Sequence, residues 1–289
     1  MYSNKHIVKI SAPILLSLLA QNIIQVIDTA FLGRVGEVEL GASALAGVIY
    51  IALYTLGFGF SMGAQILIGR RNGEKNYDKI GDIVIQGSIF LLIPAILLIP
   101  LVRYGSVHWL PLIFESADVA NAVIEYLQWR VFGIVFAFVN LMFRAFYIGT
   151  ARTRVLTVNA VVMAVANVIF DYGLIFGKLG MPEMGMAGAG IASVIAEFTS
   201  FVFLLLYTRK TVNPEKYGFN KIGFQSPRYL HIYDGAIPVL HWYVDAFLRI
   251  YRELYGREVS GRHQYRTEFL YYFYDPFQCI GLGGKYIGK

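Results

Sequence analysis

Long apolar segments recur along the first two thirds of the chain, and each carries only a few charged residues. A helix of about 20 mostly apolar residues crosses a bilayer core of about 30 Å, and every segment reaches that length. The pattern therefore predicts an all-α polytopic membrane protein: a six-helix transmembrane bundle followed by an irregular carboxy-terminal tail. The predicted spans cover residues 7–32, 40–68, 82–102, 117–148, 155–176 and 186–207.

Composition supports this interpretation. Hydrophobic residues make up 56% of the 289 positions and charged residues only 15%, whereas a soluble domain carries about 25% charged residues. The mean hydropathy is +0.54. These values exclude an ordinary soluble domain.

The net charge of +6 reflects where the basic residues lie rather than a nucleic-acid partner. They lie before the first span and after the even-numbered spans. All these positions are on one side of the membrane, which the positive-inside rule predicts to be the cytoplasmic side. We therefore expect a multi-pass protein of the cell (inner) membrane with a cytoplasmic amino terminus, and with the loop "GKLGMPEMG" at 177–185 facing outward. The basic residues on the predicted cytoplasmic side are Lys5, Lys9, Arg70, Arg71, Lys75, Lys79, Arg152, Arg154, Arg209 and Lys210.

Asp28 lies inside the first apolar segment, within "AQNIIQVIDTAFLGRVG". A charged group at the membrane centre costs at least about 2.5 kcal/mol, and such groups usually face a polar cavity and serve function. Gln21 precedes Asp28 by seven residues, so the two lie close to one face of a helix. A position near the outer headgroups is the alternative, since Gly33 follows soon after.

The fifth segment repeats this arrangement with Asn159, Asn167 and Asp171. Asn167 and Asp171 are four residues apart, so their side chains meet on a helix. Asn167 alone is explained by a hydrogen bond between helices. Two carboxyl groups within reach of each other repel, and they hold a proton or share a small cation.

Three stretches in this order resemble the amino-terminal lobe of the multidrug and toxic compound extrusion (MATE) transporters. They are "APILLSLLAQNIIQVIDTAFLG", the loop "GTARTR", and "NVIFDYGLIFGKLGMPEMGMAGAGIAS". The resemblance covers residues 9–207. It implies an antiporter with two six-helix lobes around a central cavity, which exports drugs or other amphiphilic or cationic compounds against an influx of sodium ions or protons.

The resemblance also implies roles for particular residues. Asp28, Asn167 and Asp171 match the family's cation site, and Ser193 stands where many members have threonine. These four residues are expected to couple transport to sodium or protons; no other cofactor is expected, and no metal other than a possible sodium ion. Gln21 matches a glutamine that lines the cavity, and Pro13 a proline hinge in the first helix.

Other polar residues in the apolar segments have weaker interpretations. Glu197, four residues after Ser193, is expected either to line the cavity with it or to lie toward the cytoplasm. Arg130 and Arg144 are expected to reach the interface or lipid phosphates by snorkelling. The run "GMAGAG" at 185–190 follows no strand, so close helix packing explains it better than phosphate binding.

Alternatives to drug export were also considered. A flippase for lipid-linked saccharides, from the same superfamily, would need Arg and Lys in the cavity, whereas the candidates here are acids and amides. An enzyme is not expected, because the five histidines do not pair with acids and no Ser or Cys has a nucleophile motif. The expected partners are an amphiphilic or cationic small molecule and the bilayer; no nucleic acid or obligate protein partner is inferred.

The sequence divides into three parts. Residues 1–208 form the predicted six-helix lobe, and 209–240 a cytoplasmic linker and the start of a degenerate second lobe. Residues 241–289 form an atypical tail without an apolar run of spanning length. Back-translation with a shift of one base restores apolar runs there, so the tail is expected to be a second lobe read out of frame, or else a distinct extension. In the first case the chain would be inactive by itself.

Overall fold

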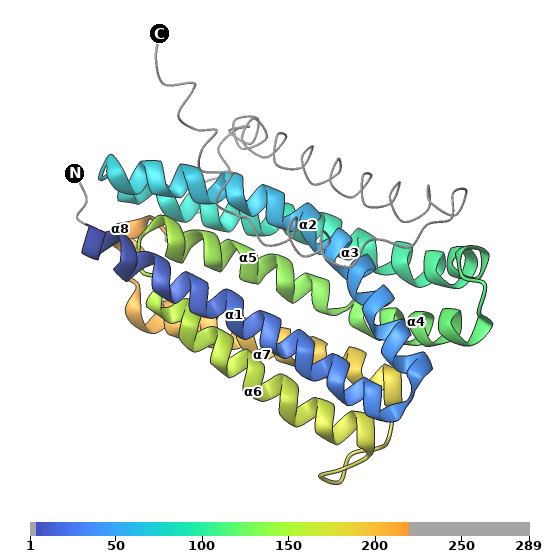
Figure 1. Cartoon of the computed structure of the whole chain (residues 1–289). Helices are drawn as coiled ribbons and strands as arrows, with labels where there is room; N and C mark the ends of the chain where they lie inside the picture. Colours follow the sequence, from blue (N-terminus) through green and yellow to red (C-terminus); the bar gives the residue numbers. More distant parts are fainter. Residues whose placement is uncertain (1–3, 220–289) are drawn as a thin grey trace, which may run out of the picture. The chain divides into compact units, whose positions relative to one another are not determined.

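The computed structural model describes residues 4–219, so both predictions for the tail lie outside the described residues. Within this range all regular structure is helical, and the elements follow one another with short connections (Figure 1). The helices are α1 (Asn4–Val35), α2 (Glu37–Gly73), η1 (Tyr77–Lys79), α3 (Ile80–Ile113), α4 (Ala117–Arg130), α5 (Gly133–Gly149), α6 (Arg154–Phe176), α7 (Gly185–Thr211) and α8 (Pro214–Tyr217).

Length and composition make several of these helices fit to cross a membrane. Four described helices meet the criterion: α2, α3 with its preceding turn, α6 and α7. The pair of α4 and α5 adds a fifth crossing if it forms one bent span. The all-α membrane fold is thus confirmed, while the count of six spans stays a prediction.

The fourth predicted span is not one straight helix. α4 and α5 meet at an angle of 55° after Arg130. At the junction the N–H groups of Phe132 and Ile134 donate to the carbonyls three residues earlier, at 3.2 and 3.1 Å. These tighter bonds interrupt the α-helical ladder, so the chain bends there without a proline.

α3 is longer than the predicted 82–102. It continues past two polar residues, Arg103 and His108, because both find partners in the structure. Arg103 donates from Nη1 to the carbonyl of Gln128 at 3.0 Å, and its guanidinium lies 5.3 Å from the centre of the Phe132 ring. His108 is one turn of helix from Tyr104 and stacks on it. The helix therefore continues past both residues.

The helices pack in a way that brings distant segments together. α6 packs against both α1 and α7, and α4 contacts both α2 and α7. Figure 1 shows α1, α6 and α7 running side by side. α5 packs against α2, α3 and α7. The acids predicted on α1 and α6 therefore lie on neighbouring helices, and α4 and α7 approach them from the interior.

Candidate functional site

The acid pair, Asp28 and Asp171, is held between α1 and α6. Asp171 is fully buried, and the carboxyl groups of the two residues lie within hydrogen-bonding distance of each other. Both groups are acceptors when ionised, so neither supplies a hydrogen to the other. A bond between them needs a proton, and a shared cation is the other way to relieve their repulsion.

Several buried oxygen atoms at the acid pair and beside it on α6 lack a hydrogen-bond donor among the described residues. Asp28 Oδ1, Asn167 Oδ1 and both carboxylate oxygens of Asp171 are buried, and no donor for them is found among the described residues. Buried acceptors without partners are rare in folded proteins. Carboxylate and amide oxygens are also ligands suited to a hard cation. Asp28 and Asp171 therefore lie together with free acceptors, and Asn167, one turn before Asp171 on α6, has a free acceptor of its own.

Ser193 and Tyr126 lie near the acid pair. Ser193, on α7, is buried, and its side chain lies close to that of Tyr126 on α4. The charges of Asp28 and Asp171 both act on the Tyr126 phenol. Sequence reasoning missed Tyr126, because its neighbour one turn away, Arg130, was expected at the interface and gave no sign that this face of the helix turns inward.

The glycines of the "GMAGAG" run explain how α7 comes this close. A Cβ atom at Gly188 would lie 2.5 Å from the carbonyl oxygen of Leu174 on α6. One at Gly190 would lie 2.8 Å from the carbonyl oxygen of Tyr126 on α4. Both positions need the bare backbone, so the prediction of close helix packing is confirmed.

Arg130 corrects the sequence prediction. It was expected to reach the interface by snorkelling, but it is only 8% exposed, and its Nη2 donates to Glu197 Oε1 at 2.6 Å. The prediction was wrong because the side chain has an acidic partner inside the bundle and does not need lipid phosphate. Glu197 is 5% exposed and lies four residues beyond Ser193 on α7. Arg144 is half-buried, with its guanidinium 6.0 Å from the centre of the Phe58 ring.

Further groups complete the surroundings of the Arg130–Glu197 ion pair. The Tyr50 hydroxyl on α2 donates to Glu197 Oε1 at 2.9 Å, and the Arg130 guanidinium lies 3.6 Å from the centre of the Tyr50 ring. Asn140 Nδ2 on α5 donates to the backbone carbonyl of Glu197 at 3.0 Å. The ion pair thus joins α2, α4 and α7 at the bend between α4 and α5.

The remaining predicted residues are placed less fully. Gln21 lies on α1, but its side chain is outside the described part of the structure. Pro13 lies within α1, and its carbonyl accepts a hydrogen bond from Thr157 Oγ1 on α6 at 2.9 Å. α1 continues through this residue, and its role as a hinge stays a prediction.

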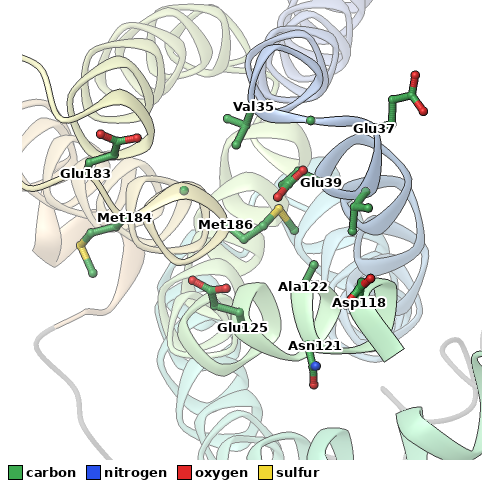
Figure 2. A pocket seen from close by; sticks show the side chains of 13 residues that line it. Val35, Glu37, Glu39, Asp118, Asn121, Ala122, Glu125, Glu183, Met184 and Met186 are labelled. Atoms are coloured by element: carbon green, nitrogen blue, oxygen red, sulfur yellow. The ribbon is translucent and has the colours of Figure 1, made fainter. Parts of the chain in front are cut away.

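A separate cavity of about 1000 Å³ opens at the end of the bundle where α1 joins α2. Its lining includes carboxylates from α2, α4 and the loop before α7, and no Lys or Arg (Figure 2). The cavity does not include the acid pair. Sequence reasoning missed it because its walls come from three distant parts of the chain. The acids are Glu37, Glu39, Asp118, Glu125 and Glu183.

A chelated transition metal is not supported at the acid pair. Within the described residues, no group of three or more His, Cys, Asp or Glu side chains is placed to hold a metal ion. Two carboxylates and one amide instead form a small oxygen-rich site, inside a bundle of membrane-spanning helices. The fold and this site together define a polytopic membrane protein with two neighbouring carboxyl groups inside its helical bundle.

The MatE family profile matches residues 13–173, and the chain belongs to this family. It is 29% identical over 201 residues to the probable multidrug resistance protein NorM of Idiomarina loihiensis, covering 69% of this chain and 43% of that protein. The probable multidrug resistance protein YoeA of Bacillus subtilis is 26% identical over 207 residues, covering 70% and 44%. The chain thus spans less than half the length of these curated relatives.

Solved structures show the same fold. An outward-facing multidrug resistance MATE family transporter of the MOP superfamily matches with a TM-score of 0.73 and 16% identity, covering 84% of this chain and 54% of that one. The eukaryotic MATE transporter AtDTX14 matches with a TM-score of 0.72 and 21% identity, covering 82% and 52%. The described bundle is therefore the amino-terminal lobe of a MATE fold.

Proposed function

We propose that the chain is the amino-terminal lobe of an antiporter that exports amphiphilic or cationic compounds in exchange for sodium ions or protons. The observation that carries the proposal is the acid pair: Asp28 and Asp171 face each other inside the bundle, and their buried oxygens have no donors among the described residues. The names of the relatives, multidrug resistance proteins, support the substrate class.

The acid pair suits ion coupling for a physical reason. Two ionised carboxylates at this distance are unfavourable in an apolar interior, so the site favours a state with a bound proton or cation. Binding or release of the ion changes the charge between α1 and α6. Since a ligand shifts an equilibrium by its different affinity for two states, an ion held here in only one conformation would drive the change.

In this proposal Asn167 and Ser193 complete the coupling site, Gln21 lies along the central cavity between the two lobes, and Pro13 softens α1. Glu197 lies beside the coupling site in its ion pair with Arg130. The carbonyl of Pro13 is already paired with Thr157 on α6. Any bending of α1 at Pro13 would therefore have to break or carry along this bond.

The acidic cavity in Figure 2 agrees with cationic or amphiphilic substrates. Its five carboxylates give it a negative potential that attracts cations and repels phosphates. A flippase for lipid-linked saccharides would need the opposite charge for a pyrophosphate group. We therefore prefer export of cationic compounds over the flippase alternative.

Transport into sealed vesicles tests the proposal. Vesicles containing this lobe as part of an intact two-lobed transporter should transport a cationic dye when a sodium or proton gradient is imposed, and should leave a lipid-linked saccharide untouched. Asp28→Asn should abolish the gradient-driven transport. Asp78→Asn makes the same chemical change at an exposed position in η1 and should have no effect.

Equal dye transport by Asp28→Asn and the wild type would refute the coupling role of this residue. Transport of the saccharide in place of the dye would favour the flippase. The variants must be compared at matched amounts of inserted protein, so that a defect in membrane insertion is not mistaken for lost coupling.

The proposed orientation, with the amino terminus in the cytoplasm, has its own test. Leu179 is 65% exposed in the loop between α6 and α7. In a background with Cys279→Ser, a cysteine replacing Leu179 should react with an impermeant thiol reagent added outside cells. A cysteine replacing the exposed Lys75 should react only after lysis, and the reverse result would invert the topology.

A further inference from the structure

The Arg130–Glu197 ion pair lies next to the acid pair but is not part of it. Arg130 is one helical turn beyond Tyr126 on α4, and Glu197 is one turn beyond Ser193 on α7. The side chains of Tyr126 and Ser193 lie close to each other. α4 and α7 thus contact each other at two places one helical turn apart. The contact between Tyr126 and Ser193 is the one beside the acid pair.

The charge of Arg130 reaches the acid pair. Its guanidinium interacts electrostatically with both Asp28 and Asp171. A guanidinium keeps its positive charge in proteins, so this charge is present whether or not the acids hold an ion. By itself it would compete with a proton or sodium ion for the two carboxylates.

Glu197 opposes that competition in two ways. The negative charge of its carboxylate offsets the positive potential that Arg130 produces at the acid pair. The bond of 2.6 Å from Arg130 Nη2 to Glu197 Oε1 also holds the guanidinium against the face of the Tyr50 ring on α2. The bare backbone of Gly133 leaves the room for this, since a Cβ atom there would meet both Glu197 Oε2 and Arg130 Nη1.

We propose that Glu197 is a positioning residue: it holds Arg130 against Tyr50 and neutralises it, so that Asp28 and Asp171 stay available to the coupling ion. This inference rests on the proposed function of the acid pair. It extends that function by naming the pair of residues that sets the affinity for the ion.

A purely structural role for the ion pair makes a different prediction. If Arg130 and Glu197 only joined α4 to α7, removing either one or both would disturb the ion site through loss of packing. If the balance of charge matters, removing Glu197 alone would impair ion binding, and removing both charges would restore it.

The experiment measures modification of Asp28 and Asp171 by dicyclohexylcarbodiimide, which reacts with protonated buried carboxyl groups. The purified full chain in detergent is treated, and labelled peptides are quantified by mass spectrometry. Sodium is titrated at a fixed pH, where a bound ion protects the acids. Protons are titrated in a second series without sodium, where protonation promotes the reaction.

Glu197→Gln should raise the half-effective concentration of the coupling ion about tenfold, the size expected for one unbalanced charge at a nearby site with an effective dielectric constant of about 20. The double variant Arg130→Gln/Glu197→Gln should return to within about threefold of the wild type. Circular dichroism and size-exclusion chromatography check that each variant is folded, and the double variant serves if Glu197→Gln alone is unstable.

Wild-type ion dependence in Glu197→Gln would overturn the inference, and so would a double variant impaired as much as the single one. If Glu197→Gln does not fold, a double variant that folds with an altered ion dependence would also overturn it. If neither sodium nor protons change labelling of the wild type, the proposed coupling site fails, which is a result distinct from failure of the inference.

Discussion

Two buried pairs of charged residues lie close together in the bundle and are opposite in character. Arg130 and Glu197 have opposite charges, a short contact of 2.6 Å and a third partner in Tyr50. Asp28 and Asp171 have like charges and oxygens without donors in the described residues. In charge the first pair is complete within the protein, whereas the second is completed only by an ion or proton. The difference lies in charge and not in hydrogen bonding, because Arg130 Nη1 and Glu197 Oε2 are also buried without a partner among the described residues.

This difference separates structure from function among buried charges. A complete ion pair is costly to break, because one charge is left alone in an apolar interior. An incomplete acid pair is costly to keep, and neutralising one of its members relieves repulsion. The free energy of unfolding should therefore fall when Arg130 or Glu197 is neutralised. It should stay unchanged or rise when Asp28 or Asp171 is neutralised.

Single neutralising substitutions in the two pairs should give the largest contrast. Arg130→Met leaves Glu197 buried without its cation, and we expect a loss of about 3 kcal/mol in the free energy of unfolding. Asp171→Asn removes one of two like charges and should leave stability unchanged or higher. Unfolding in mixed micelles, followed by circular dichroism, measures both; equal losses would erase the distinction between the pairs.

A smaller effect is expected from Gly133→Ala. The new Cβ atom would lie 2.5 Å from Arg130 Nη1 and closer still to Glu197 Oε2, so the ion pair must shift. We expect a loss of about 1–3 kcal/mol, as for other over-packed sites. Gly47→Ala on α2 is the matched control, because a Cβ there meets nothing within 4 Å. A Gly133→Ala variant as stable as that control would show that the ion pair tolerates displacement.

The smallest effect is expected at an ion pair in water. A hydrogen bond from Arg70, and a second from Arg71, lower the pKa of Glu74 at the end of α2. Its small contribution to stability is present above the ordinary pKa of a glutamate and is lost as the pH falls through the lowered pKa. Glu74→Gln should change the unfolding midpoint little at neutral pH, and high salt should abolish the difference. A salt-resistant effect as large as that of Arg130→Met would contradict this account.

The sequence predicted the acid pair because its signal is local. Asp28 and Asp171 each stand out as a lone acid in an apolar helix, and Asn167 is placed one turn away by spacing alone. The fold class followed from the apolar segments in the same way. Such features depend on residues within one helix, and so they can be read without knowing how the helices pack.

The ion pair could not be predicted in the same way, because its partners are 67 positions apart. Arg130 follows Trp129, and a basic residue beside a tryptophan is typical of a membrane interface. Only the packing of α4 on α7 shows that Arg130 turns inward. The usable signal was Glu197 itself, an acid inside the predicted span 186–207 and four residues after Ser193.

The bend between α4 and α5 was missed for a related reason. No proline marks the position, and Gln128, Arg130 and Gly133 there were not interpreted as a break in the span. The bend coincides with the place where Arg130 and Glu197 meet over Gly133. Tertiary contacts rather than local sequence therefore fix the course of this span.

The most direct test of the central claim is whether Asp28 and Asp171 bind one ion together. Carbodiimide labelling of Asp171 should depend on sodium or proton concentration in the wild type, and Asp28→Asn should shift that dependence at least about tenfold, since the site loses one of its two charges. Asp78→Asn should leave it unchanged. An ion dependence of Asp171 that is the same with and without Asp28 would contradict the account, because the two acids would then act separately.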